Sequence, residues 1–512
     1  MLQQHRFRAR RVVVIGFGPV AARLVDELLP AVREHRVQLL VIGAEPEPAY
    51  NRIMIGELAL GRTDRDLMMI SDPAALAAAG VHVRLAASVV AIDRERRFVT
   101  LSGGDQFSYD ALVFATGAAA RVPPLAGLPR TAAGVDPVLP DGVAVLRDLV
   151  DADRVAAMAG AGDLVVLGGG VLGMELALAA AEQGVATRLV HTGQVPMERN
   201  LDRTSAAIVA RHLRRERIGV IADARAESVR LQHGRFTGLV LSDGRVVEGP
   251  GLVLCCGAQP RTALAVACGL PVDRGIVVDH DLRSAADPCI YAIGDCAQIR
   301  CQQANCADCI DGQGPTGLIG PGWAQAEQLA ATLIEHGGPM NHLAPASSPV
   351  MVIKAPRLSV VSAGTIEFDP VDTLLDDGGL RVSQWSDPAA GRYAKIITRG
   401  GVLEGLICVG LPRTAAELTL LYERRAELPA DRSALLRHDG PDHAVGGDPV
   451  GPDAIVCRCN GVTAGQITDA ICAGHDDLPA ISRATRAGTG CGTCTTRICD
   501  LLNSTTEAMV TT

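Results

Sequence analysis

Near its start the chain carries the sequence Val12-Val13-Val14-Ile15-Gly16-Phe17-Gly18-Pro19-Val20-Ala21. The apolar run predicts a buried parallel strand, and the glycines predict a tight turn into a helix. Gly16 permits the turn, Gly18 lets a pyrophosphate approach the backbone, and Ala21 lets the helix pack on the strand. The next predicted strand, residues 37–42, ends near Glu45, a carboxylate placed to accept hydrogen bonds from a ribose. The stretch therefore predicts a βαβ unit that binds a dinucleotide.

The same pattern returns in the sequence Leu164-Val165-Val166-Leu167-Gly168-Gly169-Gly170-Val171-Leu172-Gly173-Met174-Glu175. All three glycines of the fingerprint are present, at Gly168, Gly170 and Gly173. Glu175 follows at the start of the predicted helix, where a carboxylate suits the positive helix end even without a nucleotide. Two such loops predict an α/β protein with two Rossmann-like domains and two bound dinucleotides.

Two close cysteine pairs lie near the C-terminus, Cys457-x-Cys459 and Cys491-x2-Cys494, with 31 residues between them. Thiolates are the preferred ligands of iron–sulfur iron, and a folded helical spacer could bring the pairs to one cluster. The alternative is a zinc knuckle. Zinc sites usually pair cysteines two residues apart at both ends, so the tighter first pair favours iron–sulfur.

A second group of cysteines comprises Cys296, Cys301, Cys306 and Cys309. The last three have the spacing of three plant-type ferredoxin ligands, but a fourth ligand upstream of them would be an unusual order. A second cluster, a structural zinc and reduced loop thiols therefore all stay open. The remaining cysteines fall mainly in apolar segments and are predicted to be small core residues: Cys255, Cys256, Cys268, Cys289, Cys408, Cys472 and Cys499.

The composition limits the classes of partner. The 512 residues allow three or four domains. A net charge of −9 and an aromatic content of 3% argue against nucleic acid or an anionic membrane as the main partner.

The apolar segment from Leu164 to Ala181 contains three consecutive glycines, which predict a strand, turn and helix rather than a membrane span. Removal of the basic start as a signal peptide would destroy the first loop, so a cytoplasmic protein is expected.

Two further segments resemble those of the two-dinucleotide flavoprotein reductases. They are Tyr109-Asp110-Ala111-Leu112-Val113-Phe114-Ala115-Thr116-Gly117 and Ile290-Tyr291-Ala292-Ile293-Gly294-Asp295. The resemblance implies FAD in the first site and NAD(P)H in an inserted second domain. It also implies that Thr116, Gly117 and Asp295 contact FAD, and that Glu175 lies near the nicotinamide.

The chain lacks the Cys-x4-Cys pair of disulfide reductases, because its first cysteine is Cys255. Its loop Pro48 to Ile55, which contains Arg52, resembles that of the NAD(P)H-dependent nitrite reductase large subunit and of assimilatory nitrate or nitrite reductase electron-transfer subunits. This resemblance runs over residues 10–505, and the C-terminal module is similar to bacterioferritin-associated ferredoxin-like (BFD-like) [2Fe-2S] domains. It implies electron flow from NAD(P)H through FAD to a [2Fe-2S] cluster on Cys457, Cys459, Cys491 and Cys494.

The acceptor implied by the resemblance is a separate nitrate or nitrite reductase catalytic subunit, because we expect no room for sirohaem and [4Fe-4S] modules before Thr512. The resemblance is also compatible with a homodimer. Two other classes stay open: a subunit of an amino-acid or opine dehydrogenase, and an iron-delivery or redox-sensing protein. The choice of coenzyme also stays open, because His191 stands where NAD-specific sites often carry a carboxylate. A neutral or cationic group there could tolerate the 2′-phosphate of NADPH, and Arg199 could help, but a histidine at this position is also compatible with a plain surface residue; NADH is favoured.

These landmarks predict the domain organisation. An FAD-binding domain takes residues 8–130 and 250–338, and an NAD(P)H-binding domain takes residues 131–249. An α+β domain follows at 345–438. A Gly-, Pro- and Asp-rich linker at 439–452 leads to a small helical BFD-like domain at 453–505.

Overall fold

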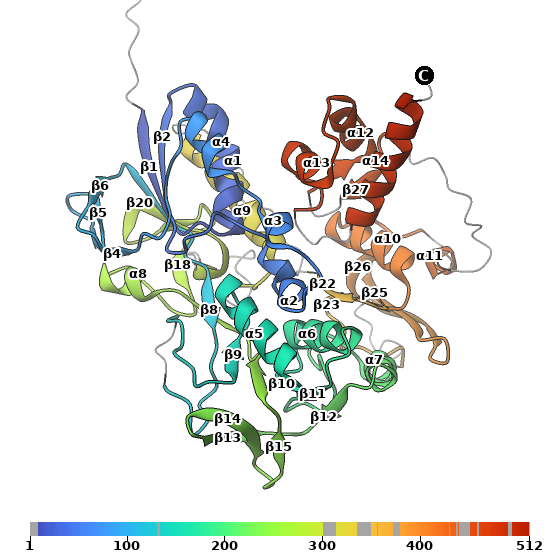
Figure 1. Cartoon of the computed structure of the whole chain (residues 1–512). Coiled ribbons are helices and arrows are strands. Elements are labelled where there is room, and N and C mark those ends of the chain that lie inside the picture. Colours follow the sequence, from blue (N-terminus) through green and yellow to red (C-terminus); the bar gives the residue numbers. More distant parts are fainter. Residues whose placement is uncertain are drawn as a thin grey trace, which may run out of the picture.

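The structure is a computed structural model, shown in Figure 1. It describes residues 9–130, 134–300, 314–334, 350–355, 357–371, 379–429, 431–436, 439, 451–457, 460–489 and 494–510. The predicted α/β class is confirmed, with two mainly parallel sheets, a five-stranded antiparallel sheet and a small helical module. Within the described residues, no helix is both long and apolar enough to cross a membrane.

The first Rossmann domain is built on a six-stranded sheet in the order β19-β20-β7-β1-β2-β3. Its strands are β1 (Arg10–Ile15), β2 (Val37–Ile42), β3 (His82–Arg84), β7 (Ala111–Phe114), β19 (Arg283–Ser284) and β20 (Asp287–Ala292). β1 pairs in parallel with β2 on one side and with β7 on the other. The strand order therefore switches at β1, which is where open α/β sheets form a ligand crevice at the carboxyl ends of their strands.

Helix α1 (Pro19–Arg33) follows β1 directly and packs beside α9 (Ile319–Ile334). Gly18 is its N-cap, Pro19 occupies the first turn, and Leu24, Val25 and Leu28 form a buried stripe at helical spacing. The smaller elements are η1 (Arg52–Met54), α2 (Ile55–Ala59), α3 (Arg65–Met68), α4 (Pro73–Ala78), β4 (Val89–Asp93), β5 (Phe98–Leu101), β6 (Gln106–Ser108), α8 (Ala263–Ala267), β18 (Ile276–Val278), η2 (Gly294–Cys296) and β21 (Ala297–Ile299).

The second Rossmann domain has a five-stranded parallel sheet in the order β12-β11-β10-β16-β9. Its elements are β9 (Val143–Val145), α5 (Leu149–Ala161), β10 (Leu164–Leu167), α6 (Val171–Glu182), β11 (Thr187–Val190), α7 (Arg203–Arg215), β12 (Gly219–Ile221) and β16 (Gly251–Leu254). A hairpin sheet of β13 (Ala226–Gln232), β14 (Arg235–Leu241) and β15 (Val246–Glu248) extends from it (Figure 1). The apolar segment from Leu164 is thus a strand, turn and helix, as predicted.

The chain passes between the two Rossmann domains twice. These crossings, β8 (Ala118–Ala120) and β17 (Ala258–Pro260), pair with each other in antiparallel fashion. The paired crossings form a short two-stranded ribbon between the domains (Figure 1).

The third domain is a five-stranded antiparallel sheet in the order β22-β23-β26-β25-β24. Its elements are β22 (Met351–Ala355), β23 (Leu358–Gly364), β24 (Leu380–Asp387), β25 (Arg392–Arg399), β26 (Val402–Val409), α10 (Pro412–Glu423) and α11 (Ser433–Leu436). One face packs under α10, with Ala394 and Leu418 in a common core. The other face shares a core with α6 of the second Rossmann domain, through Ile353, Val360 and Met174.

The cysteine module forms the C-terminal end (Figure 1, red). It contains β27 (Ile455–Cys457), β28 (Val462–Thr463), α12 (Ala464–Cys472), α13 (Leu478–Thr485) and α14 (Thr495–Val510). Thr463 and Gln466 form a reciprocal capping box that starts α12. The module has its own small core, which includes Cys457, Ile467, Ile481, Cys494 and Ile498.

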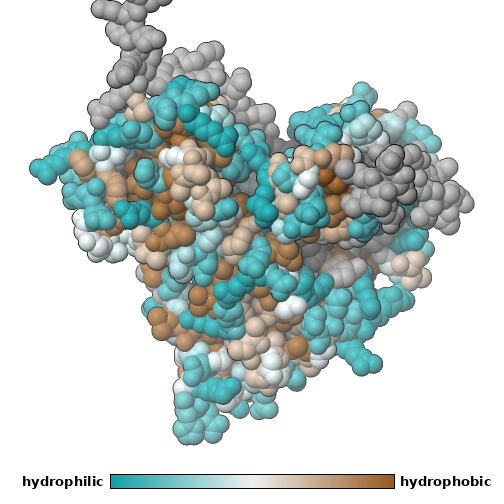
Figure 2. Space-filling model, turned by 45° about the horizontal axis from the view of Figure 1, so that its top comes forward, coloured by the Kyte–Doolittle hydropathy of each residue, from teal (hydrophilic) through white to brown (hydrophobic). Residues whose placement is uncertain are grey.

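Polar and apolar residues are mixed over the surface. Figure 2 shows hydrophobic residues in scattered patches among hydrophilic ones on the face in view. Such scattered apolar residues are normal on protein surfaces and identify no membrane or partner face by themselves.

Candidate dinucleotide and iron–sulfur sites

The first glycine loop joins β1 to α1. Gly16 has φ +104°, and a Cβ there would lie 2.2 Å from the carbonyl oxygen of Ala115 on the neighbouring segment, so no other residue fits. The next glycine, Gly18, is the extended N-cap of α1 and leaves the first amide groups of the helix without a side-chain cap. Such amides and the positive helix end form a binding site for a pyrophosphate. Ala21 is buried one turn further on, as helix-on-strand packing requires.

Glu45 lies after β2 and is held by two neighbours. Tyr50 donates its hydroxyl to Glu45 Oε2 at 2.7 Å, and Arg52 forms an ion pair with Glu45 Oε1. The Arg52 guanidinium also stacks over the Tyr50 ring, 4.6 Å from its centroid. A Cβ built on Gly18 would lie 3.8 Å from Arg52 Nε, so this cation reaches the first glycine loop. The group therefore combines an acceptor suited to a ribose with a cation suited to a phosphate.

Asp295 and Arg147 form an ion pair across the two Rossmann domains. Arg147 Nη2 donates to Asp295 Oδ2 at 2.7 Å, and Arg147 Nε donates to the carbonyl of Ala118 at 3.2 Å. Thr116, on the segment before that carbonyl, donates its hydroxyl to the carbonyl of Arg261 at 2.9 Å. Gly117 follows Thr116 with positive φ. Arg147 is a site residue that the sequence reasoning missed; its signal was a cation directly before the helix cap Asp148.

The helix after Arg147 is tied to it by a buried carboxylate. Asp151 Oδ2 accepts from the amide of Arg147 at 2.9 Å, and Asp151 and Asp148 form the capping box of α5. Burial and the neighbouring Asp148 raise the pKa of Asp151 to about 6. These contacts fix the main chain from which the Arg147 side chain reaches Asp295.

The second glycine loop is built like the first. Gly168 has φ +127°, and a Cβ there would lie 2.2 Å from the carbonyl oxygen of Cys255. Gly170 is the extended N-cap of α6 and, like Gly18, carries no side-chain cap. Gly173 is buried on the first turn of α6, and Glu175 lies on the same helix. The loop thus offers a second set of helix amides to a phosphate.

His191 follows β11 and lies beneath the second glycine loop. Its side chain is 5% exposed, and within the described part of the chain its Nε2 has no hydrogen-bond partner. Burial lowers the pKa of His191, although Asp223 and Glu198 oppose the shift. The imidazole is therefore neutral near pH 7 and brings no positive charge to a 2′-phosphate. Arg199, a cation further along the loop after β11, is exposed.

The cysteine module brings one cysteine of each predicted pair into the same core. Cys457, 0% exposed, and Cys494, 5% exposed, lie in one core cluster. Asn460 Nδ2 lies 3.7 Å from Cys457 Sγ, and it also donates to the carbonyl of Arg486 at 2.7 Å. Their partners Cys459 and Cys491 lie outside the described residues. Two buried thiols from the two pairs fit the thiolate donor set of an iron–sulfur cluster.

Of the second group of cysteines predicted from the sequence, the structure describes one member, Cys296. Cys296 is fully buried in the core of the first Rossmann domain, where its Sγ lies 3.3 Å from the carbonyl oxygen of Ile293. Burial raises the pKa of this thiol. Cys301, Cys306 and Cys309 lie outside the described residues, and among those described no cluster of three or more His, Cys, Asp or Glu is placed to hold a metal. A second metal therefore stays a prediction.

The scattered cysteines are mostly at least partly buried. Cys255 and Cys408 are buried, and burial raises the pKa of both thiols. Cys256, Cys268, Cys289 and Cys499 are half-buried. Cys472 is exposed at the end of α12, so the core prediction was wrong for this residue. The sequence pattern alone does not say which side of a short helix faces the core.

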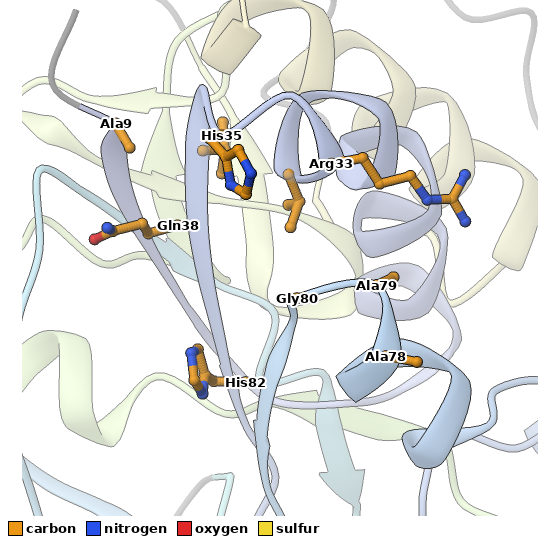
Figure 3. A pocket seen from close by; sticks show the side chains of 10 residues that line it. Ala9, Arg33, His35, Gln38, Ala78, Ala79, Gly80 and His82 are labelled. Carbon is orange, nitrogen blue, oxygen red and sulfur yellow. The ribbon is translucent and has the colours of Figure 1, made fainter. Parts of the chain in front are cut away.

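A hollow of ≈ 580 Å³ lies away from both glycine loops (Figure 3). Its lining includes Arg33 at the end of α1, His35, Gln38 on β2 and His82 on β3. These residues are at the amino ends of the parallel strands, whereas α/β sheets bind nucleotides at the carboxyl ends. The hollow is therefore not the dinucleotide site.

Comparisons with known proteins agree with this geometry. The family model for pyridine nucleotide-disulphide oxidoreductases matches residues 10–308, and the model for BFD-like [2Fe-2S] binding domains matches residues 455–504. The chain is 27% identical to the nitrite reductase [NAD(P)H] of Bacillus subtilis over 94% of its length, covering 56% of that protein. It is 26% identical to the assimilatory nitrate reductase electron transfer subunit of the same organism over 98% of its length, covering 61% of that protein.

The chain therefore spans between about half and three fifths of the length of the curated relatives it matches over most of its own length. The putidaredoxin reductase in its covalent complex with putidaredoxin has a similar structure, with a TM-score of 0.69 at 22% identity, covering 83% of this chain and 95% of that one. An NAD-dependent persulfide reductase from A. fulgidus gives 0.67 at 20% identity, covering 96% and 83%. At these identities the structures show the fold alone. The resemblance inferred from the sequence motifs is confirmed.

Proposed function

The chain belongs to the pyridine nucleotide-disulphide oxidoreductase family, and from this premise we propose that it is an NAD(P)H-dependent flavoprotein that transfers electrons. NAD(P)H is the proposed donor, and FAD and a [2Fe-2S] cluster are the proposed carriers. The catalytic subunit of an assimilatory nitrate or nitrite reductase is the proposed acceptor. The observation that carries the proposal is the presence, in one chain, of two glycine loops of like construction and a module with buried cysteines.

FAD, when bound, supplies a centre that takes up electrons in pairs and releases them singly. The first glycine loop and the amides of α1 would hold its pyrophosphate, with Arg52 as the nearby cation. Glu45 would accept from its ribose, and Arg147 of the second domain would close the site together with Asp295 of the first. Gly168, Gly170 and Gly173 would hold the pyrophosphate of NAD(P)H.

The cysteine distribution supports an exit for electrons by single steps. No cysteine precedes Cys255, so the loop at Arg52 carries no dithiol that could take an electron pair. The module with Cys457 and Cys494 offers a metal centre instead. Cys457, Cys459, Cys491 and Cys494 are the proposed cluster ligands.

The proposed acceptor rests on the relatives. One relative that matches 98% of this chain is named as an electron transfer subunit of assimilatory nitrate reductase. If a separate protein reduces nitrate or nitrite, this chain needs no residue that touches either anion. A negative net charge of −9 on this chain is compatible with a protein partner that presents a basic surface.

An anaerobic EPR experiment tests the route. The purified, cluster-loaded protein is mixed with NADH or with NADPH, and dithionite measures the total reducible cluster. We expect a reduced iron–sulfur signal with at least one nucleotide. A signal with dithionite alone would overturn the proposal and favour a dehydrogenase subunit that takes electrons from an organic substrate.

A variant separates the two halves of the route. We expect Cys457→Ser to abolish reduction of a protein acceptor while NAD(P)H-to-ferricyanide activity is kept, because ferricyanide can take electrons directly from a flavin. Equal loss of both activities would mean that Cys457, which is fully buried, serves the fold instead.

A further inference from the structure

Arg486 connects the cysteine module to the first Rossmann domain. Its Nη1 donates to Glu27 Oε1 at 3.0 Å, and its Nε lies 3.8 Å from Asp26 Oδ2. Both carboxylates belong to α1, the helix that starts at the first glycine loop. With a rise of about 1.5 Å per residue, the contact lies roughly 11 Å along α1 from its first residue. The module thus contacts the helix that would bind the flavin pyrophosphate.

The backbone at Arg486 indicates that the side chain has a role. Arg486 ends α13 in the left-handed conformation, with φ 64°. Glycine or asparagine is usual at this position, because a Cβ is unfavourable there. The sequence keeps a long cationic residue despite this cost, and the contact with Glu27 is a physical reason for it.

The same residue borders the proposed cluster. The carbonyl of Arg486 accepts from Asn460 Nδ2 at 2.7 Å, and this amide lies 3.7 Å from Cys457 Sγ. Thr489 Oγ1 lies 3.1 Å from the same amide. One asparagine side chain therefore joins the backbone of the docking residue to Cys457, a proposed cluster ligand, so Cys457 lies buried on the side of the module that carries Arg486.

The contact is suited to opening and closing. The side chains of Arg486, Asp26 and Glu27 are 35%, 38% and 32% exposed. Partly exposed ion pairs are weak and are screened by salt. Arg23 also lies 3.3 Å from Glu27, so α1 can neutralise part of its acidic charge when the module leaves.

We propose that Asp26 and Glu27 form a docking site for the [2Fe-2S] module on α1, and that Arg486 holds the module there in equilibrium with a released state. The inference deepens the proposed function and rests on it in one respect: the docked state is the one in which the cluster collects electrons. The released state leaves the Cys457 side of the module open to an acceptor protein.

The lysine content of the chain allows a direct test of docking. The sequence has two lysines, Lys354 and Lys395, and Lys395 is 1% exposed. An Arg486→Lys variant therefore places a new amine beside Asp26 and Glu27, and a carbodiimide can join it to either carboxylate. We expect a cross-linked peptide between residue 486 and α1 in the full-length protein, with a yield that falls severalfold from 50 to 500 mM salt.

The matched control is Arg483→Lys, since Arg483 is an exposed residue of the same helix and, within the described part of the chain, forms no ion pair with α1. It should give little cross-link to α1. Equal yields from the two variants, or no cross-link at position 486, would overturn the docking site.

The second test removes the contact without harming the fold. Arg486→Gly favours the left-handed cap and deletes the guanidinium. We expect NAD(P)H to reduce the flavin at the wild-type rate, while the rate of cluster reduction, one electron at a time, falls about fivefold. Arg483→Ala is the control and should change neither rate. An unchanged rate of cluster reduction in Arg486→Gly would overturn the inference. If NAD(P)H does not reduce the flavin of the wild-type protein, the proposed function is refuted, and the cross-linking experiment still tests the docking site.

Discussion

The third domain and the cysteine module are attached to the rest of the molecule in opposite ways. The third domain shares an apolar core with the second Rossmann domain, and a buried lysine crosses the boundary. Lys395, 1% exposed, donates to the carbonyl of Ile366 at 3.0 Å and lies 3.3 Å from Asp202 Oδ2. The module instead contacts α1 through Arg486, whose side chain is 35% exposed.

The two kinds of contact explain how one chain can combine a firmly attached domain with a module that can be released. A buried ion pair that loses one partner leaves an uncompensated charge, so such a contact holds two domains permanently. A partly exposed pair is worth little and opens readily. The cysteine module has the second kind of contact, which suits the proposed exchange of electrons with two partners.

The largest effect is expected at Lys395. Lys395→Met removes the cation and leaves the partly buried Asp202 carboxylate without its charged partner, so we expect a loss of about 3 kcal/mol in the free energy of unfolding. Chemical denaturation followed by circular dichroism measures this loss. Arg399→Met, an exposed change at the end of the same strand, is the control. A loss below about 1 kcal/mol would place this contact in the same class as an exposed pair.

The second prediction concerns how the contact between the third domain and the second Rossmann domain at Asp202 responds to acid. Burial raises the pKa of Asp202, but hydrogen bonds from Tyr393 and Ser205 and the charge of Lys395 outweigh it, so the pKa lies below its ordinary value of 3.8. A lowered carboxyl pKa stabilises the fold above the unfolded-state pKa and loses this contribution as pH falls through the folded-state value.

We therefore expect the third domain to loosen below about pH 4, as measured by hydrogen exchange in β25. Asp202→Asn should remove this part of the pH dependence and lower stability at pH 7. An Asp202→Asn protein that keeps the wild-type acid profile would show that another carboxyl is responsible.

The pair Arg147–Asp295 should give an intermediate effect, because its side chains are 28% and 22% exposed. We expect Arg147→Ala to weaken FAD binding about tenfold, since it removes a charged contact between the two Rossmann domains at the proposed flavin site. Fluorescence of released flavin measures the change. Arg154→Ala on α5, whose arginine is 56% exposed, should bind FAD normally.

The smallest effect is expected at the docking site. Asp26→Asn with Glu27→Gln should lower the docked fraction by about the same few-fold factor as Arg486→Gly. The combined variant should show little further loss, because both changes remove one interaction. Small-angle scattering at low salt follows the docked fraction, and additive losses would indicate that the residues act separately.

Sequence reasoning predicted the α/β class, the family and the two glycine loops, because each depends on short patterns. The exclusion of a membrane span at Leu164 succeeded for the same reason, since three adjacent glycines interrupt it. Arg147 and the shared core of Ile353 and Met174 were missed. Their side chains have ordinary neighbours in the sequence, and only the approach of distant elements gives them a role.

What the sequence determined by itself is local: glycine spacing that permits a turn, an apolar run that forms a strand, and cysteine spacing that suits a cluster. What the tertiary structure decided is which charges meet. Arg147 and Asp295 are 148 positions apart, and Arg486 and Glu27 are 459 apart. Backbone patterns depend on neighbours along the chain, whereas an ion pair depends on distance in space, which only the packed domains define.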